Sequence, residues 1–344
     1  LGLWLWQLNL TEAIRTLPLS TRTIDLSAPF ERWGFAFQLQ SSAIPILVVS
    51  CLVTASAAIL VLHMQQGPGF APFALGLLFG YLLLALLSAG PLPPPLLTPL
   101  FLVTLSTLSI FMLQAGRLNQ STGPLRTLLP PLLAFPLFLL AFWYIEQIPL
   151  NPQDNAAQQM AGQLLSLGFL LLLAPVPLHS AQPVSAQSAP PVVTAFATLL
   201  YQFAVVHLFF RLYHAYPFLI EATHFADWLT WAGLATAVWG GLAAAGTTHP
   251  GRLWGYAALH DWGIILLVLA VPSPRSWTLA LFLLGLRAVS MFTAGAGLAL
   301  LEERSEQFAP EQLQGIGNRL PWNCAAFLLG GLGLLGFPLS AGFT

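Results

Sequence analysis

The sequence predicts an all-α fold, a polytopic bundle of transmembrane helices. Hydrophobic residues make up 57% of its 344 residues and charged residues only 7%, whereas soluble domains carry about 25% charged residues. Apolar runs of about 20 residues, the length that a bilayer core requires, recur along the chain. Because a lipid-exposed span must satisfy its own backbone hydrogen bonds, we expect at least about nine spanning helices and no β-sheet.

The chain divides into a short N-terminal part and one helical domain. Residues 1–40 indicate the tail of a truncated helix followed by a charged extramembrane loop, and residues 41–344 a single transmembrane domain with about ten spans. Turn-forming Gly, Pro and Asn residues separate the spans, at 67–69, 90–91, 151–152, 190–191, 249–251 and 272–274. The expected spans are residues 42–63, 70–89, 97–115, 128–144, 163–178, 192–213, 226–245, 253–271, 277–301 and 322–339.

The centre of the chain combines a polar linker with an unusually polar span. Residues 178–191 predict a loop, with the next helix beginning near Pro191, since proline suits a first helical turn. That helix carries Gln202, His207 and Arg211 in otherwise apolar sequence. Ionisable side chains at membrane depth are costly and persist where they line a cavity or an ion path. His207, Arg211 and His214 form one stripe along this helix. The stripe fits a proton relay, and it also fits an arginine and a histidine that extend from the helix end to the lipid headgroups.

A second polar site lies further along, at His260 and Asp261. Adjacent residues point about 100° apart on a helix, so these two do not form one site by themselves. Asp261 lies inside its predicted span, so it is either protonated or paired with an arginine such as Arg287 or Arg211. A structural pair and a proton-carrying pair both remain open. The chain has no lysine, and arginine does not release its proton.

Several function classes are disfavoured by composition. The net charge of −1 gives no electrostatic case for binding nucleic acid. Cys51 and Cys324 lie far apart in apolar segments and indicate small buried residues rather than a disulfide or a metal site. No catalytic triad, phosphate-binding loop or haem ligand pair stands out, so we expect no catalytic, cofactor or metal site in this chain. Arginines divide evenly between alternate loops, which leaves the membrane orientation open.

Four stretches resemble one family in both content and order. That family is the antiporter-like, proton-translocating membrane subunits of respiratory complex I, related cation/proton antiporters and membrane-bound hydrogenases. The stretches are PLHS at 177–180 with APP at 189–191 and Arg211; GLATA at 233–237 with RLWGYAALHDWG at 252–263; LR at 286–287 through AG at 294–295; and GIG at 315–317 with LP at 320–321 and GFPLSAGF at 336–343.

The resemblance implies inverted repeats of five helices with interrupted helices near the midplane, the second repeat being incomplete here. It implies a membrane-arm subunit of a complex I-like NAD(P)H/quinone oxidoreductase, with redox chemistry, quinone and flavin in partner subunits. Those partners would include another antiporter-like subunit, with lipid around them. The location would be an energy-transducing membrane, either a bacterial plasma membrane or a thylakoid-type membrane.

Departures from the family pattern put proton translocation in doubt. The span at 97–115 lacks the family's glutamate, and the family's lysine position falls at or near Gln202. A second lysine aligns with Arg287, and the family's histidine aligns with Asp261 or His260. Two alternatives therefore stay open: a structural scaffold, or the membrane subunit of an inorganic-carbon or cation transport complex. If a proton path exists, we expect it to depend on His207, His260 and Asp261 linked by water.

Overall fold

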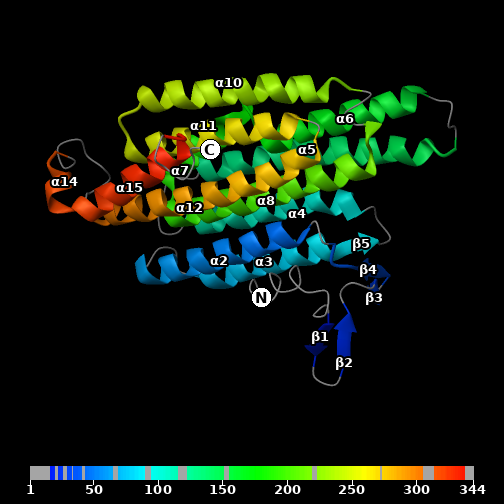
Figure 1. Ribbon diagram of the computed structural model, residues 1–344, viewed down its shortest axis with the longest axis horizontal. Helices are drawn as coiled ribbons and strands as arrows, with labels where there is room; N and C mark the ends of the chain where they lie inside the picture. Colours follow the sequence, from blue (N-terminus) through cyan, green and yellow to red (C-terminus); the bar gives the residue numbers. More distant parts are fainter. Residues whose placement is uncertain are drawn as a thin grey trace.

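The computed structural model describes residues 16–19, 22–25, 29–32, 34–40, 43–64, 69–89, 94–114, 122–150, 155–218, 223–271, 273–304 and 314–337. Long helices lie side by side in a bundle, and small strands stand at one edge of it (Figure 1). The all-α prediction is confirmed. The principal helices are α2 (Ile44–Met64), α3 (Phe70–Leu86), α4 (Pro94–Gln114), α5 (Thr122–Gln147), α6 (Asn155–Leu173), α7 (Ala181–Ser188), α8 (Pro191–Ala215), α10 (Phe225–Ala245), α11 (Pro250–Ala270), α12 (Pro274–Arg304), α14 (Ile316–Arg319) and α15 (Pro321–Leu334).

Each expected span coincides with a helix of the structure. In the part of the chain that is described, six helical stretches are long and apolar enough to cross a membrane: Ile44–Met64, Thr122–Gln147, Asn155–Ser188, Pro191–Ala215, Pro250–Ala270 and Arg275–Arg304. Shorter apolar helices occupy three further positions, Phe70–Leu86, Leu96–Ile110 and Pro321–Leu334. Helix α10 occupies the remaining one.

The expectation of no β-sheet was wrong. Strands β1 (Thr16–Leu19) and β2 (Arg22–Asp25) form an antiparallel pair. Strands β3 (Phe30–Arg32), β4 (Phe35–Phe37) and β5 (Leu87–Ala89) form a second sheet in that order. The span expected at 70–89 therefore ends early, because the chain after Leu86 pairs with β4 instead of continuing the helix. Both sheets are antiparallel and lie at the edge of the helical bundle (Figure 1).

The prediction of a loop at 178–191 was also wrong, because the middle of this segment is helical. Helix α6 ends at Leu173, a short 3-10 turn spans Leu178–Ser180, and residues 181–188 form α7. Pro183 sits in the first turn of α7, where its missing N–H is not needed. Helix α8 does begin at Pro191, as predicted. Helices α6 and α7 together form one interrupted membrane helix, with Ala174 in a left-handed conformation at the break.

Helix α8 is the centre of the bundle. It contacts α2, α3, α4, α6, α7 and α12, and most of its side chains are buried. Helix α10 lies at one edge and packs chiefly on α11 (Figure 1). Its Gly233 and Gly240 face α11: a Cβ at Gly240 would collide with the backbone of His260, and one at Gly233 would make a tight contact with the Gly263 carbonyl. Gln202 and His207, which are buried in the middle of α8, therefore meet other helices rather than lipid.

Candidate functional site

A buried charge cluster joins α8, α11 and α12. The Arg287 guanidinium donates from Nη1 to Asp261 Oδ2 at 2.5 Å and to the Ala258 carbonyl at 2.7 Å. Its Nε donates to Gln202 Oε1 at 2.9 Å. The Arg287 side chain is fully buried, whereas 16% of the Asp261 side chain is exposed. The ring of Trp262 lies 5.7 Å from the guanidinium carbon, within the range of a cation–π contact.

The geometry of α11 explains how this cluster forms. Ala258 and Asp261 are three residues apart, so a carbonyl and a carboxylate reach the same face of the helix. A buried guanidinium requires a partner, and truncating such a pair leaves an uncompensated charge. Of the two arginines considered from the sequence, the structure pairs Asp261 with Arg287. Because arginine does not release its proton, the positive charge of this cluster is fixed.

His207 belongs to a different cluster, between α8 and α3. Its Nδ1 lies 3.4 Å from the Tyr81 hydroxyl, and the two rings meet edge to face at 6.1 Å. Tyr81 also stacks on Phe101 of α4. His207 and Gln202 are five positions apart on α8, about 7.5 Å along its axis. Two of the residues expected to share a path, His207 and Asp261, are therefore built into separate contacts.

Arg211 caps the end of α3. Its Nη1 donates to the Leu84 carbonyl at 3.3 Å and its Nη2 to the Leu87 carbonyl at 2.7 Å. The Leu84 carbonyl also accepts the Leu87 N–H, and carbonyls at a helix C-terminus carry partial negative charge, so a cation is favoured there. Arg211 thus connects α8 to the point where α3 becomes β5. His214, which completes the expected stripe, is exposed and packs against the ring of Phe210.

His260 faces α10. Its Nδ1 donates to the Ala237 carbonyl at 2.8 Å, while the neighbouring Asp261 reaches α12. His260 therefore joins α11 to α10 and Asp261 joins α11 to α12, because adjacent residues on a helix point about 100° apart. Of the six candidate residues, the structure brings together Gln202, Asp261 and Arg287. It places His207, Arg211 and His260 at three other contacts.

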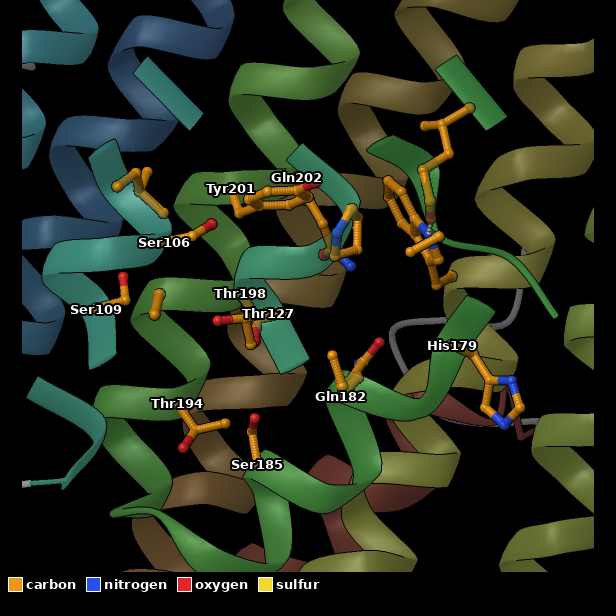
Figure 2. A pocket seen from close by; sticks show the side chains of 17 residues that line it. Ser106, Ser109, Thr127, His179, Gln182, Ser185, Thr194, Thr198, Tyr201 and Gln202 are labelled. Carbon is orange, nitrogen blue, oxygen red and sulfur yellow. Dashed lines mark hydrogen bonds between the residues drawn. The ribbon is translucent and has the colours of Figure 1, made fainter. Parts of the chain in front are cut away.

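A cavity of about 90 Å³, lined by apolar as well as polar side chains, adjoins this cluster, and the sequence did not predict it. Figure 2 shows hydroxyl and amide side chains converging on it from α4, α5, α7 and α8. Gln202 and Trp262 line the cavity and also contact Arg287. One available signal was the pairing of serines three apart at 106 and 109 with threonines four apart at 194 and 198, each pair on one face of an apolar helix. The polar lining comprises Ser106, Ser109, Thr127, His179, Gln182, Ser185, Thr194, Thr198, Tyr201 and Gln202.

The site offers hydrogen bonding and fixed charge. Within the described residues, no three His, Cys, Asp or Glu side chains come together as a metal site would require. Asp261 is the one carboxylate of the charge cluster, and its Oδ2 already accepts a hydrogen bond from Arg287.

Comparison with known proteins identifies the family. The family model described as NADH:quinone oxidoreductase/Mrp antiporter, TM matches residues 133–344, more than half of the chain. NADH-quinone oxidoreductase subunit N of Rhodococcus opacus is 29% identical over 197 residues, covering 56% of this chain and 36% of that protein. Subunit N 1 of Solidesulfovibrio magneticus is 29% identical over 259 residues, covering 70% and 54%. The chain thus spans about a third to a half of the length of these relatives.

Solved structures share the fold. The membrane-bound sulfane sulfur reductase, an archaeal respiratory membrane complex, contains a chain that matches 98% of this one with a TM-score of 0.76 and 16% identity, over 70% of its own length. A chain of the Mrp complex from Dietzia sp. matches 90% with a TM-score of 0.71 and 18% identity, over 60% of its length. The chain is therefore an integral membrane protein that belongs to the NADH:quinone oxidoreductase/Mrp antiporter family.

Proposed function

We propose that this chain is an antiporter-like subunit of the membrane arm of a complex I-like, redox-driven ion-translocating complex. One observation carries the proposal: the buried Gln202–Arg287–Asp261 cluster at the junction of α8, α11 and α12, in a chain of this family. Intramembrane ionisable groups mark ion pathways by default. The redox chemistry, quinone and flavin belong to partner subunits, and the complex lies in an energy-transducing membrane.

The outward faces of the bundle support assembly with other membrane subunits. Helix α5 exposes a broad leucine face, and α10 exposes three tryptophans. Such surfaces pack against lipid or against other helices. We propose that another antiporter-like subunit covers part of this surface and that lipid covers the rest.

The first experiment tests membership in a complex. An affinity tag on the natural full-length protein, followed by mild detergent extraction from native membranes and mass spectrometry, is expected to recover other membrane subunits in equal amounts, a second antiporter-like chain among them. A protein that purifies alone, with no comparable membrane subunit, would overturn the proposal.

A scaffold role without proton conduction is the second candidate, favoured by the engagement of the cluster. The Arg287 guanidinium binds three acceptors at once and keeps its charge. His207 and His260 are held by Tyr81 and by the α10 backbone. The two candidates differ in what Asp261 does, since it is the group of the Gln202–Arg287–Asp261 cluster that is able to exchange a proton.

A triple variant separates conduction from scaffolding. Asp261→Asn, His207→Gln and His260→Gln are introduced together into the intact complex, and pumping stoichiometry is measured beside electron transfer. Asp261→Asn is expected to destabilise the chain, so only complexes that assemble normally are compared. In these, conduction through this chain predicts fewer ions per electron with electron transfer retained. Unchanged stoichiometry in a normally assembled complex supports the scaffold.

A further inference from the structure

Helix α6 ends inside the bundle, and side chains from other helices hold its last carbonyls. The helix stops at the buried Leu173, and Ala174 takes a left-handed conformation at the break before α7. Carbonyls in the last turn of a helix lack intrahelical donors and must find donors elsewhere. The Leu173 carbonyl accepts the indole N–H of Trp262 on α11 at 2.8 Å. The Leu172 carbonyl accepts the hydroxyl of Tyr201 on α8 at 3.0 Å. These two donors therefore fix the carboxyl end of α6.

The ring of the same tryptophan lies against the buried charge. Trp262 is 3% exposed, and its ring centroid is 5.7 Å from the guanidinium carbon of Arg287. At this distance the guanidinium is attracted by the quadrupole of the indole, and the absence of solvent strengthens that attraction. Asp261, the preceding residue of α11, supplies the counter-charge to the same guanidinium. Trp262 thus binds the helix break through its N–H and the fixed charge through its ring.

The second donor to the break is connected to the charge less directly. Tyr201 holds α6, whereas its neighbour Gln202 accepts the Nε–H of Arg287. Adjacent residues point about 100° apart on a helix, so these two contacts are made by separate side chains joined through the α8 backbone. Trp262 makes both of its contacts with one rigid ring system. The structure therefore contains a direct link between the break and Arg287, and it runs through Trp262.

We propose that Trp262 is a positioning residue that couples the charge of Arg287 to the break between α6 and α7. The indole moves as one body, so a shift of the guanidinium that displaces the ring also displaces the donor to the Leu173 carbonyl. A change at Asp261, which holds the guanidinium in place, is therefore transmitted to the end of α6. This inference rests on the proposed function, because it gives the charge cluster of an ion-translocating subunit a means of moving a helix.

Two backbone amides report on the break itself. The Val176 N–H donates to the Thr236 hydroxyl of α10 at 2.9 Å, and the Leu178 N–H donates to the Pro175 carbonyl at 2.6 Å. Hydrogen exchange at these amides, measured by mass spectrometry against the core of α2 as an internal reference, follows local opening of the break rather than global unfolding. The measurement uses the natural full-length protein with the subunits that accompany it, so its outcome does not depend on which complex they form.

Asp261→Asn perturbs the far end of the link. It removes the counter-charge to Arg287, so exchange at the two amides should become about threefold faster or more, relative to the α2 reference. In a Trp262→Phe background an aromatic ring remains but the N–H is absent, and Asp261→Asn should then leave exchange at the break close to that of Trp262→Phe alone. A response of undiminished size in that background overturns the proposal, and so does the lack of any response in the natural background.

Tyr201→Phe is the matched control. It also removes one donor from the end of α6, but it leaves the indole in contact with both α6 and Arg287, so the response to Asp261→Asn should persist. If the response disappears here and persists with Trp262→Phe, the link runs through α8 and the proposal is wrong. Where Asp261→Asn does not assemble, Asp261→Leu combined with Arg287→Met takes its place. Exchange at the break is then expected to change when position 262 is Trp and to stay unchanged when it is Phe.

Discussion

Asp261 and Arg287, 26 positions apart in the sequence, meet at 2.5 Å inside the bundle and hold α11 to α12. The arginine is fully buried and cannot relieve its charge by losing a proton. The Asp261 carboxylate is therefore required as the counter-charge to Arg287.

Removing the carboxylate alone should destabilise the protein strongly. Asp261→Asn leaves the guanidinium with carbonyl and amide acceptors but no counter-charge, and breaking a buried pair in this way costs about 3–5 kcal/mol. Chemical unfolding in detergent, followed by tryptophan fluorescence, measures the loss.

The matched control removes both charges. Asp261→Leu combined with Arg287→Met replaces the pair by apolar side chains of similar volume, which is often neutral or stabilising. We expect this double variant to recover most of the stability that Asp261→Asn loses. If Asp261→Asn is as stable as the natural sequence, Arg287 does not depend on Asp261.

Arg211 should control the end of α3 and the strand that follows it. Arg211→Gln loses two hydrogen bonds from a charged donor, each worth about 1.5–3 kcal/mol. Amide exchange measured by mass spectrometry should become faster over residues 84–89, while α11 stays protected. Arg211→Lys keeps the charge near the helix end and should give an intermediate rate. Unchanged exchange at 84–89 in Arg211→Gln would contradict the capping role.

Close packing of α10 on α11 depends on glycine at position 263. A Cβ there would collide with the backbone of Ala237, so Gly263→Ala must push the helices apart. Overpacking of this kind costs about 1–3 kcal/mol, and the His260–Ala237 hydrogen bond should weaken with it. Gly285→Ala on α12 is the control, because its Cβ meets nothing within 4 Å. The unfolding temperature should fall for Gly263→Ala and stay unchanged for Gly285→Ala. Equal unfolding temperatures for the two variants would show that α10 is not closely packed on α11.

The sequence was sufficient for features set by local chemistry. The all-α class, the breaks at Gly and Pro and the start of α8 at Pro191 follow from composition and turn residues. The cost of a buried charge narrowed Asp261 to two states, protonated or paired with an arginine, and did not decide between them. The choice of Arg287 over Arg211 could not be predicted, because it depends on how three helices are rotated against one another.

Tertiary contacts account for the remaining errors. Helix α7 is short and polar, and its sequence alone favours a loop. In the structure it packs on α11, where Gly251 and Gly255 let the two backbones approach closely. The strand β5 depends on pairing with β4, some 50 residues earlier in the chain. The cavity is lined by residues of six helices, α4, α5, α6, α7, α8 and α11, and no local pattern brings the hydroxyls of different helices together.

The last prediction concerns His249, which precedes α11 outside the span. Its Nδ1 accepts the Gly251 N–H at 3.1 Å and so caps the helix. Burial lowers the pKa of His249, and the positive charge of Arg252 lowers that pKa further. The folded protein therefore favours the neutral ring. Its stabilising contribution is complete above the unfolded-state pKa of about 6.5 and is lost as pH falls from there through the lower folded-state pKa.

His249→Asn keeps a capping acceptor without a titrating ring, so its unfolding temperature should fall less than that of the natural sequence between pH 8 and pH 5. His249→Ala should lose about 1 kcal/mol at pH 8, through the missing cap, and should show the same shallow dependence on pH. Both variants are compared with the natural sequence by thermal unfolding across that range. If all three proteins lose stability in parallel, protonation of His249 contributes nothing, and the cap at the start of α11 does not sense pH.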